Sequence, residues 1–187
     1  MTMLTIDALP LAGLKCITRR KLGDSRGFLS RLFCADELAE AGWTKPVAQV
    51  NHTLSRVPGI VRGLHYQRPP HAEMKLVSCL SGAIWDVVVD LRAGSPTFLA
   101  WHGQVLSAEN GAALLIPEGF AHGFQTLEPE TNLIYLHSAA YAPEAEAAVR
   151  FDDPRVAISW PRSPTEMSER DQHHPYLTPD FSGIIIP

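Results

Sequence analysis

The sequence predicts an all-β fold of many short antiparallel strands, arranged as a barrel or a sandwich. Fifteen prolines and 13 glycines divide the 187 residues into short segments, which favours turns over long helices. Within residues 84–91, Trp85, Val87, Val89 and Leu91 fall on one face, and a period of two is typical of a strand. Turn signals recur between such runs, and this spacing is typical of antiparallel barrels and sandwiches.

Four strands can be placed with some precision. They are expected over residues 75–79, 84–91, 112–116 and 133–137. Helical patterns are scarce. Residues 36–41 predict a short helix, with Asp36 as its N-cap and Gly42 just past its end. Residues 143–149 predict a second one, because proline suits a first helical turn.

Length and composition limit the classes of protein to consider. A chain of 187 residues is near the size of a single domain, so residues 1–187 are expected to form one domain, with a tail from about residue 161 packing on the barrel. The net charge of −4 gives no reason to expect nucleic acid as a partner. No apolar run reaches the ~18 residues of a membrane span, and the N-terminal residues do not read as a signal peptide.

The cysteines point to a reducing compartment. Cys16, Cys34 and Cys79 are odd in number and widely separated, and no C-x-x-C pair is present. Such a pattern suggests neither a disulfide framework nor a zinc knuckle. A cytoplasmic location is the simplest expectation.

A histidine motif raises the question of a metal site. Residues 111–122 have the spacing G-x5-P-x-G-x2-H, which resembles the second motif of the cupin superfamily and brings His122 to the barrel mouth. In the first cupin motif Gly59 and His65 match, but Gln67 stands where a second histidine is expected. An amide is a much poorer ligand than imidazole. We therefore expect a metal-free acid–base site, although His122 could also be an ordinary hydrogen-bonded barrel histidine.

Longer stretches resemble the dTDP-4-dehydrorhamnose 3,5-epimerase family. They occur in order from about Asp24 to Asp171. The matching segments are residues 24–28, 63–67, 75–77, 86–92, 95–98, 106–110, 116–124, 152–154 and 160–161. The resemblance implies a cupin-type jelly-roll β-barrel with a few short helices, and a homodimer. It also implies cofactor-independent epimerisation at C3 and/or C5 of a nucleoside-diphosphate 4-keto-6-deoxy sugar.

The resemblance assigns a catalytic role to four residues. His65 matches the base, and histidine suits this role because its ordinary pKa is about 6.5. Asp171 matches the carboxylate that orients this histidine, although Ser168 and Asp171 also have the spacing of a helix-capping box. Lys75 matches a residue near the sugar oxygens, where an ammonium would favour the developing enolate. Tyr141 matches the acid on the far side of the sugar ring from the histidine. Tyrosine suits this role because a phenol with a pKa of about 10 stays protonated at neutral pH.

Other positions match substrate contacts. Arg26 and Arg62 match residues that hold the diphosphate, to which the guanidinium fork is suited. Tyr135 matches a second tyrosine of the site. Gln49 and Asn51 are plausible polar contacts on the strand leading to His65. We include His122 in the substrate-binding set.

One position departs from the family pattern and leaves the nucleotide open. Arg31 stands where the family has a glutamate close to the nucleotide, so the sequence is compatible with dTDP or with another nucleotide. The pairing of His65 with Tyr141 favours an epimerase over a 3,4-ketoisomerase, because inversion needs a proton donor on the far face of the ring. The sequence is also compatible with a C3-only epimerase, a metal-dependent cupin or a non-catalytic sugar-binding cupin.

Overall fold

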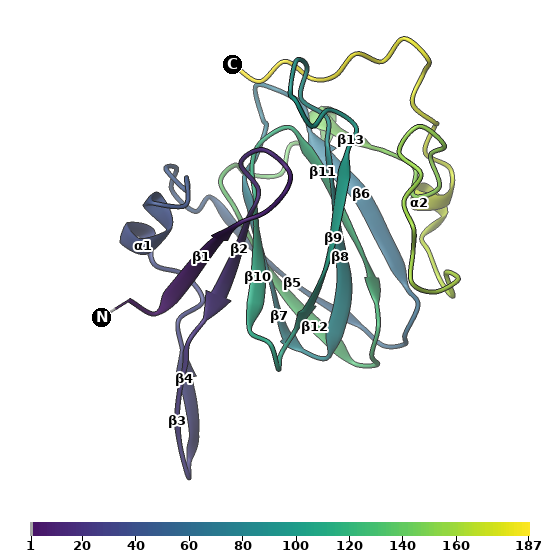
Figure 1. The fold of residues 1–187 in the computed structure, drawn as a ribbon. Helices are drawn as coiled ribbons and strands as arrows, with labels where there is room; N and C mark the ends of the chain where they lie inside the picture. The colour runs from purple at the N-terminus through teal and green to yellow at the C-terminus, as the bar shows by residue number, and fades with distance from the viewer. Residues whose placement is uncertain (1) are drawn as a thin grey trace.

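The computed structural model describes residues 2–187, which fold into two facing antiparallel β-sheets (Figure 1). The larger sheet has six strands in the order β1-β2-β10-β7-β12-β5. Their bounds are Leu4–Ala8, Lys15–Arg19, Ala112–Ile116, Lys75–Ser81, Thr131–His137 and Gln49–Ser55. The smaller sheet has five strands in the order β13-β6-β11-β8-β9. Their bounds are Glu146–Ala148, Val61–Gln67, Phe120–Thr126, Ala83–Asp90 and Trp101–Ser107. This is the predicted all-β jelly roll.

Both faces of the smaller sheet are covered, so β8 is buried along almost its whole length. Ile84 and Val88 pack in the core between the two sheets. Val87 and Val89 point to the opposite face, as the alternation predicts, and pack in a second cluster. Four apolar side chains of the C-terminal segment pack against this second cluster: Trp160, Leu177, Phe181 and Ile184. In Figure 1 the segment runs past the smaller sheet and over the end of the barrel.

The helices are shorter than predicted. Helix α1 spans Ala35–Ala39, and its N-cap is Cys34, which makes no side-chain capping hydrogen bond. The prediction of Asp36 as N-cap is therefore wrong by two positions: Asp36 lies in the first turn instead, where its negative charge suits the helix dipole. Gly42 follows the helix with a φ of 103°, a left-handed conformation that glycine adopts without strain.

The predicted helix over residues 143–149 is wrong beyond its first turn. Only a 3₁₀ turn forms, Pro143–Ala145, and the chain then enters strand β13 at the edge of β6. Backbone hydrogen bonds in both directions join Leu64 and Val149, at 3.2 and 2.9 Å. Pairing with an open strand edge thus satisfies backbone groups that a short helix would leave unpaired.

A two-stranded hairpin projects from the body of the molecule (Figure 1). It consists of β3, Lys21–Asp24, and β4, Gly27–Ser30. Phe28 and Leu29 are 63% and 69% exposed although they are large apolar residues. An isolated hairpin is at best marginally stable in water, so this segment lacks the packing that the rest of the chain has.

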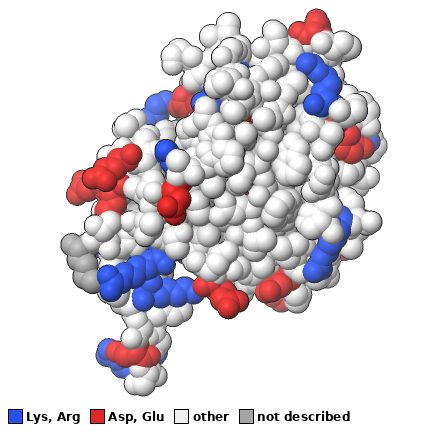
Figure 2. All heavy atoms as spheres, viewed as in Figure 1, with Lys and Arg blue, Asp and Glu red and all other residues white. Residues whose placement is uncertain are grey.

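The charged side chains on the face drawn in Figure 2 form small groups of both signs, separated by wide uncharged areas. This face therefore shows no continuous basic stripe of the kind that binds nucleic acid. Neither helix within residues 2–187 has the length and apolar character needed to cross a membrane.

Candidate active site

A cavity of about 710 Å³ opens between the two sheets. One wall carries side chains of β6 and β11, and the facing wall carries side chains of β5, β7 and β12. The chain around helix α2 (Glu169–Gln172) forms part of the rim. The polar lining includes Asn51, Arg62, His65, Glu73, Lys75, His122, Tyr135, His137, Tyr141, Glu146, Arg170 and Asp171.

Two glycines allow β6 and β11 to approach closely beside the site. A Cβ on Gly63 would lie 2.5 Å from the Cα of Gly123 and 2.7 Å from the carbonyl oxygen of His122. Gly63 also has a φ of 117°, which side chains disfavour. The strand register shifts just after the cross-strand pair of His65 and His122. Bulges of this kind re-aim neighbouring side chains.

His65 and Asp171 form a hydrogen-bonded pair at one end of the cavity. The Nε2 atom of His65 lies 2.8 Å from Oδ1 of Asp171, which is 3% exposed. The backbone N–H of Gly63 donates to Oδ2, at 3.3 Å. Burial acts to raise the pKa of Asp171, but the hydrogen bond and charge of His65 outweigh it and lower the pKa below its usual value. The carboxylate thus stays ionised and can accept a hydrogen bond from a proton on Nε2 of His65. In this tautomer Nδ1 carries the free lone pair and can act as a base.

The capping box and the pair with His65 are both present. Ser168 is the N-cap of α2, and its hydroxyl accepts a hydrogen bond from the backbone N–H of Asp171 at 3.1 Å. The backbone of Asp171 therefore serves the cap, while its side chain is free to reach His65. The two interpretations of this motif are compatible because they use different atoms.

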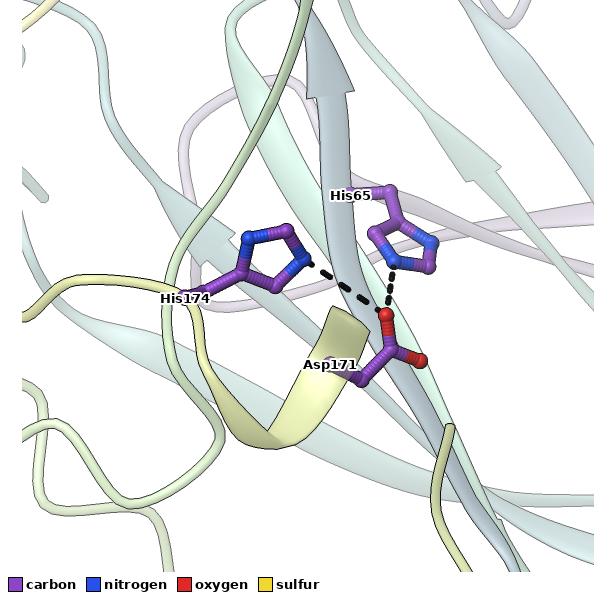
Figure 3. A group of neighbouring side chains, drawn as sticks. All are labelled: His65, Asp171 and His174. Atoms are coloured by element: carbon purple, nitrogen blue, oxygen red, sulfur yellow. Dashed lines mark hydrogen bonds and ion pairs between the residues drawn. The ribbon is translucent and has the colours of Figure 1, made fainter. Parts of the chain in front are cut away.

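A second histidine lies against the same carboxylate. Nε2 of His174 is 3.5 Å from Oδ1 of Asp171, and its ring meets the His65 ring edge-on with centroids 6.0 Å apart (Figure 3). Burial and the charge of His65 lower the pKa of His174. Arg170 approaches the same oxygen at 3.8 Å and also pairs with Glu146 at 2.9 Å.

Lys75 faces into the cavity rather than outward. Its ammonium donates to the backbone carbonyl of His65 and pairs with Glu73, both at 3.2 Å. Glu73 also contacts Nδ1 of His137 at 2.9 Å. Burial acts to raise the pKa of Glu73, but His137 and Lys75 outweigh it and lower the pKa. These contacts fix the lysine in place on the wall opposite His65.

His122 is buried at the back of the cavity beside Asp86. Its Nε2 atom lies 2.8 Å from Oδ1 of Asp86, which is fully buried. Burial raises the pKa of Asp86, and the nearby His122 offsets only part of this effect. The other oxygen of Asp86 has no hydrogen-bond partner within residues 2–187. The His122 ring also meets the Tyr135 ring edge-on at 6.0 Å.

The two tyrosines differ in environment. Tyr135, on β12, is 8% exposed, and its hydroxyl has a long 3.5 Å contact with Thr53. Burial raises its pKa well above the usual value for a phenol. Tyr141 is 52% exposed, and its hydroxyl donates to Glu146 at 2.9 Å. This hydrogen bond raises the pKa of Tyr141.

Two more of the predicted substrate contacts, Arg62 and Asn51, line the cavity. Arg62 also donates a hydrogen bond to Ser55 at 3.3 Å. Gln49 lies outside the lining; its amide bridges the backbone N–H of Tyr141 and the side chain of Asn51, at 2.9 and 3.0 Å. Gln49 therefore positions these two residues.

The remaining two predicted contacts lie away from this chain's own cavity. Arg26 sits at the tip of the β3–β4 hairpin, 88% exposed, and pairs with Asp24 at 2.5 Å. Arg31 follows the hairpin and forms an ion pair with Glu37. Neither is among the residues that line the cavity.

Gln67, at the position of a cupin metal ligand, uses its amide to hold loops together. Its nitrogen donates to the carbonyls of His71 and Ala140, at 2.9 and 3.2 Å. Its oxygen accepts a 2.6 Å hydrogen bond from the backbone N–H of Ala142. With the amide occupied in this way, the first cupin motif offers only His65 as a ligand.

Sequence reasoning missed four polar residues of the site and its rim: His137, Glu146, Arg170 and His174. Strand alternation could have found His137, which lies two residues after Tyr135 and so on the same face of β12. His174 is three residues past Asp171 and lies just beyond the end of α2.

Comparison with known proteins gives a consistent family. The model of the dTDP-4-dehydrorhamnose 3,5-epimerase family matches residues 8–179. The chain is 44% identical over 177 residues to a dTDP-4-dehydrorhamnose 3,5-epimerase of Sinorhizobium fredii, covering 91% of this chain and 88% of that protein. It is 41% identical to a dTDP-4-dehydrorhamnose 3-epimerase of Streptomyces niveus, covering 88% and 79%.

Solved structures agree with this grouping. The dTDP-4-dehydrorhamnose 3,5-epimerase of Bacillus anthracis, determined with TDP and pyrophosphate bound, superposes with a TM-score of 0.90 at 38% identity, covering 93% of this chain and 99% of that one. An epimerase of Legionella pneumophila in complex with dTDP-4-keto-L-rhamnose gives 0.85 at 40% identity, covering 90% and 89%. The chain belongs to the dTDP-4-dehydrorhamnose 3,5-epimerase family.

Proposed function

We propose that this protein epimerises a dTDP-linked 4-keto-6-deoxy sugar next to its ketone, by proton transfer and without a cofactor. The observation that carries the proposal is the arrangement of one cavity: a histidine–aspartate pair on one wall faces a lysine and a tyrosine on the other. These are the three groups that the reaction requires, namely a base, a stabiliser of the enolate and an acid.

In the first step, Nδ1 of His65 takes the proton from the carbon beside the ketone. The C–H electron pair moves to form the enolate C=C bond, and the carbonyl electrons move to the C4 oxygen. Asp171, held to Nε2 at 2.8 Å, stabilises the imidazolium that results. Lys75, on the opposite wall, favours the negative oxygen. Since Glu73 and the backbone carbonyl of His65 hold the lysine, its ammonium is ordered before substrate binds.

In the second step, a tyrosine hydroxyl returns a proton to the other face of the same carbon. Family resemblance favours Tyr141, but the geometry favours Tyr135. Tyr135 lies on the sheet opposite His65, and among residues 2–187 its hydroxyl has only one contact, a long one with Thr53. The Tyr141 hydroxyl is already hydrogen-bonded to Glu146 at the rim. We therefore assign the acid to Tyr135 and a substrate contact to Tyr141. Exchange with water then returns one proton to the tyrosine and removes one from His65.

The proposal includes a homodimer in which the β3–β4 hairpin serves a second copy of the chain. Leu22, Phe28 and Leu29 of the hairpin are exposed, and exposed apolar clusters mark interaction surfaces. On this proposal, Arg26 reaches the partner's cavity and joins Arg62 in holding the diphosphate. Arg31, paired with Glu37, anchors the base of the hairpin.

Subunit complementation tests this arrangement. An Arg26→Ala variant and a His65→Ala variant should each be nearly inactive alone at low substrate concentration. When they are unfolded and refolded together in equal amounts, about half of the dimers contain one of each chain, and each of these has one intact site, so activity should return to about a quarter of the parent value. If Arg26 acted within its own chain, the mixture would stay inactive.

Product analysis tests the substrate and the carbons inverted. The protein is incubated with dTDP-, UDP-, GDP- and CDP-linked 4-keto-6-deoxyglucose, the products are reduced with borohydride, and the released sugars are identified by chromatography. We expect turnover of the dTDP sugar, with inversion at both C3 and C5. Inversion at C3 alone would make the protein a 3-epimerase, and unchanged sugars with all four nucleotides would contradict the proposed reaction.

We further propose a cytoplasmic location, in keeping with the free thiols of all three cysteines.

A further inference from the structure

His65, Asp171 and His174 form a compact cluster of three potential metal ligands. One atom from each residue, Nε2, Oδ1 and Nε2, lies within 4.8 Å of the other two. The three come from two separate parts of the chain: strand β6 carries His65, helix α2 carries Asp171, and His174 follows the helix (Figure 3). Figure 3 shows both imidazole rings turned toward the same carboxylate oxygen.

The side chain of His174 is not explained by the proposed reaction. Its Nε2 atom is shielded from solvent and makes no hydrogen bond within residues 2–187. Its contact with Oδ1 of Asp171 is 3.5 Å. A buried polar atom without a hydrogen bond costs free energy, so the fold tolerates a penalty to keep an imidazole nitrogen aimed at an oxygen that His65 already uses.

We propose that these three residues bind Zn²⁺ and that the bound ion switches the active site off. The donor set is two imidazoles and one carboxylate, which suits zinc and leaves a fourth position open. Tetrahedral zinc with bonds of about 2.0–2.1 Å places its ligand atoms roughly 3.3 Å apart. The observed separations from Oδ1, 2.8 Å to His65 and 3.5 Å to His174, bracket that value.

Inhibition follows from the chemistry of the imidazole ring. For zinc to bind Nε2 of His65, the proton that Nε2 shares with Asp171 would move to Nδ1, and the lone pair then on Nε2 would go to the metal. A neutral imidazole coordinated through Nε2 carries its proton on Nδ1. Nδ1 is the atom proposed to accept the sugar proton, so the metal-bound histidine has no lone pair left for this step.

The surrounding charges are mixed. Arg170 lies 3.8 Å from Oδ1 of Asp171 and opposes a cation, but it also pairs with Glu146 at 2.9 Å. Access is open, because the His65 side chain is 28% exposed at the cavity wall. The inference rests on the proposed role of His65, although zinc binding itself does not depend on turnover.

Calorimetric titration of metal-stripped, full-length protein with ZnCl2 tests the site, and CoCl2 provides a spectroscopic signature. The matched variants are His174→Asn and His173→Asn. His173 is the adjacent histidine, and its ring bonds to the carbonyl of Glu169 at 2.6 Å. We expect the parent and His173→Asn to bind one zinc and to give the visible absorption of tetrahedral cobalt. His174→Asn should bind zinc at least ~10-fold more weakly and lose the cobalt spectrum.

Enzyme activity in the presence of zinc provides the second test of the proposal. Zinc should stop exchange of the sugar protons in the parent, EDTA should restore it, and His174→Asn should resist zinc relative to its own metal-free rate. Zinc binding that is absent from the parent, or that is unchanged in His174→Asn, would overturn the inference. If the parent binds zinc as described but exchanges no sugar protons without it, the proposed function fails and the metal site stands.

Discussion

Replacing His65 with asparagine is expected to reduce exchange of the C3 and C5 sugar protons by about 10²- to 10⁴-fold, the usual contribution of a general base. Asparagine can still donate a hydrogen bond to Asp171, so the carboxylate is not left buried without a partner. The loss should appear in kcat more than in KM, because the base acts on the bound sugar. Proton NMR in D2O measures the rate.

His173→Asn is the matched control, since it changes a nearby exposed histidine that does not line the cavity. Its exchange rate should equal that of the parent. Thermal unfolding of both variants checks that the fold is retained. A His65→Asn protein that is folded and exchanges both protons at the parent rate would refute the assignment of the base.

Replacing Tyr135 with phenylalanine is expected to separate proton removal from inversion. His65 can still remove the proton, so deuterium should enter the sugar from D2O. The proton donor on the opposite wall is missing, so formation of inverted product should fall by about 10²-fold or more. Because the Tyr135 hydroxyl has one long contact at 3.5 Å, its removal should have little effect on stability.

Tyr141→Phe is the comparison that tests the choice between the two tyrosines. It removes a rim hydroxyl that donates to Glu146, so we expect a change mainly in KM. If Tyr141→Phe abolished inversion while Tyr135→Phe left it intact, the acid would be Tyr141, as the family resemblance alone suggests.

The strands were the most predictable part of the fold. Residues 112–116 form β10 with the predicted bounds, and the alternation of Val87 and Val88 assigns them to opposite faces. Local pattern is sufficient there because a strand's side chains alternate regardless of its neighbours. The helix over residues 143–149 was wrong because the open edge of β6, distant in sequence, captures this segment as β13.

Parts of the site needed the tertiary structure. The spacing of Ser168 and Asp171 indicated a cap, but 106 residues separate Asp171 from His65, and no local pattern brings them together. Glu73 and His137 also lie far apart in sequence and meet only through the pairing of β7 with β12. The positions of Arg26 and Arg31 depend on how the hairpin packs, which the sequence pattern does not specify.

The identity of the carbons that are inverted does not follow from overall similarity. A 3,5-epimerase and a 3-epimerase are 44% and 41% identical to this chain, so relatives with the two activities have almost the same sequence identity to it.

Proton exchange followed by NMR tests the central claim most directly. The parent protein, freed of metal, is incubated in D2O with dTDP-4-keto-6-deoxyglucose, and the C3 and C5 proton signals are recorded over time. A cavity that pairs the His65 base with an acid on the opposite wall predicts that both signals disappear and that the spectrum of an inverted sugar replaces the original one. Persistence of both signals, with the nucleotide sugar bound and unchanged, would contradict the account and indicate a non-catalytic sugar-binding protein.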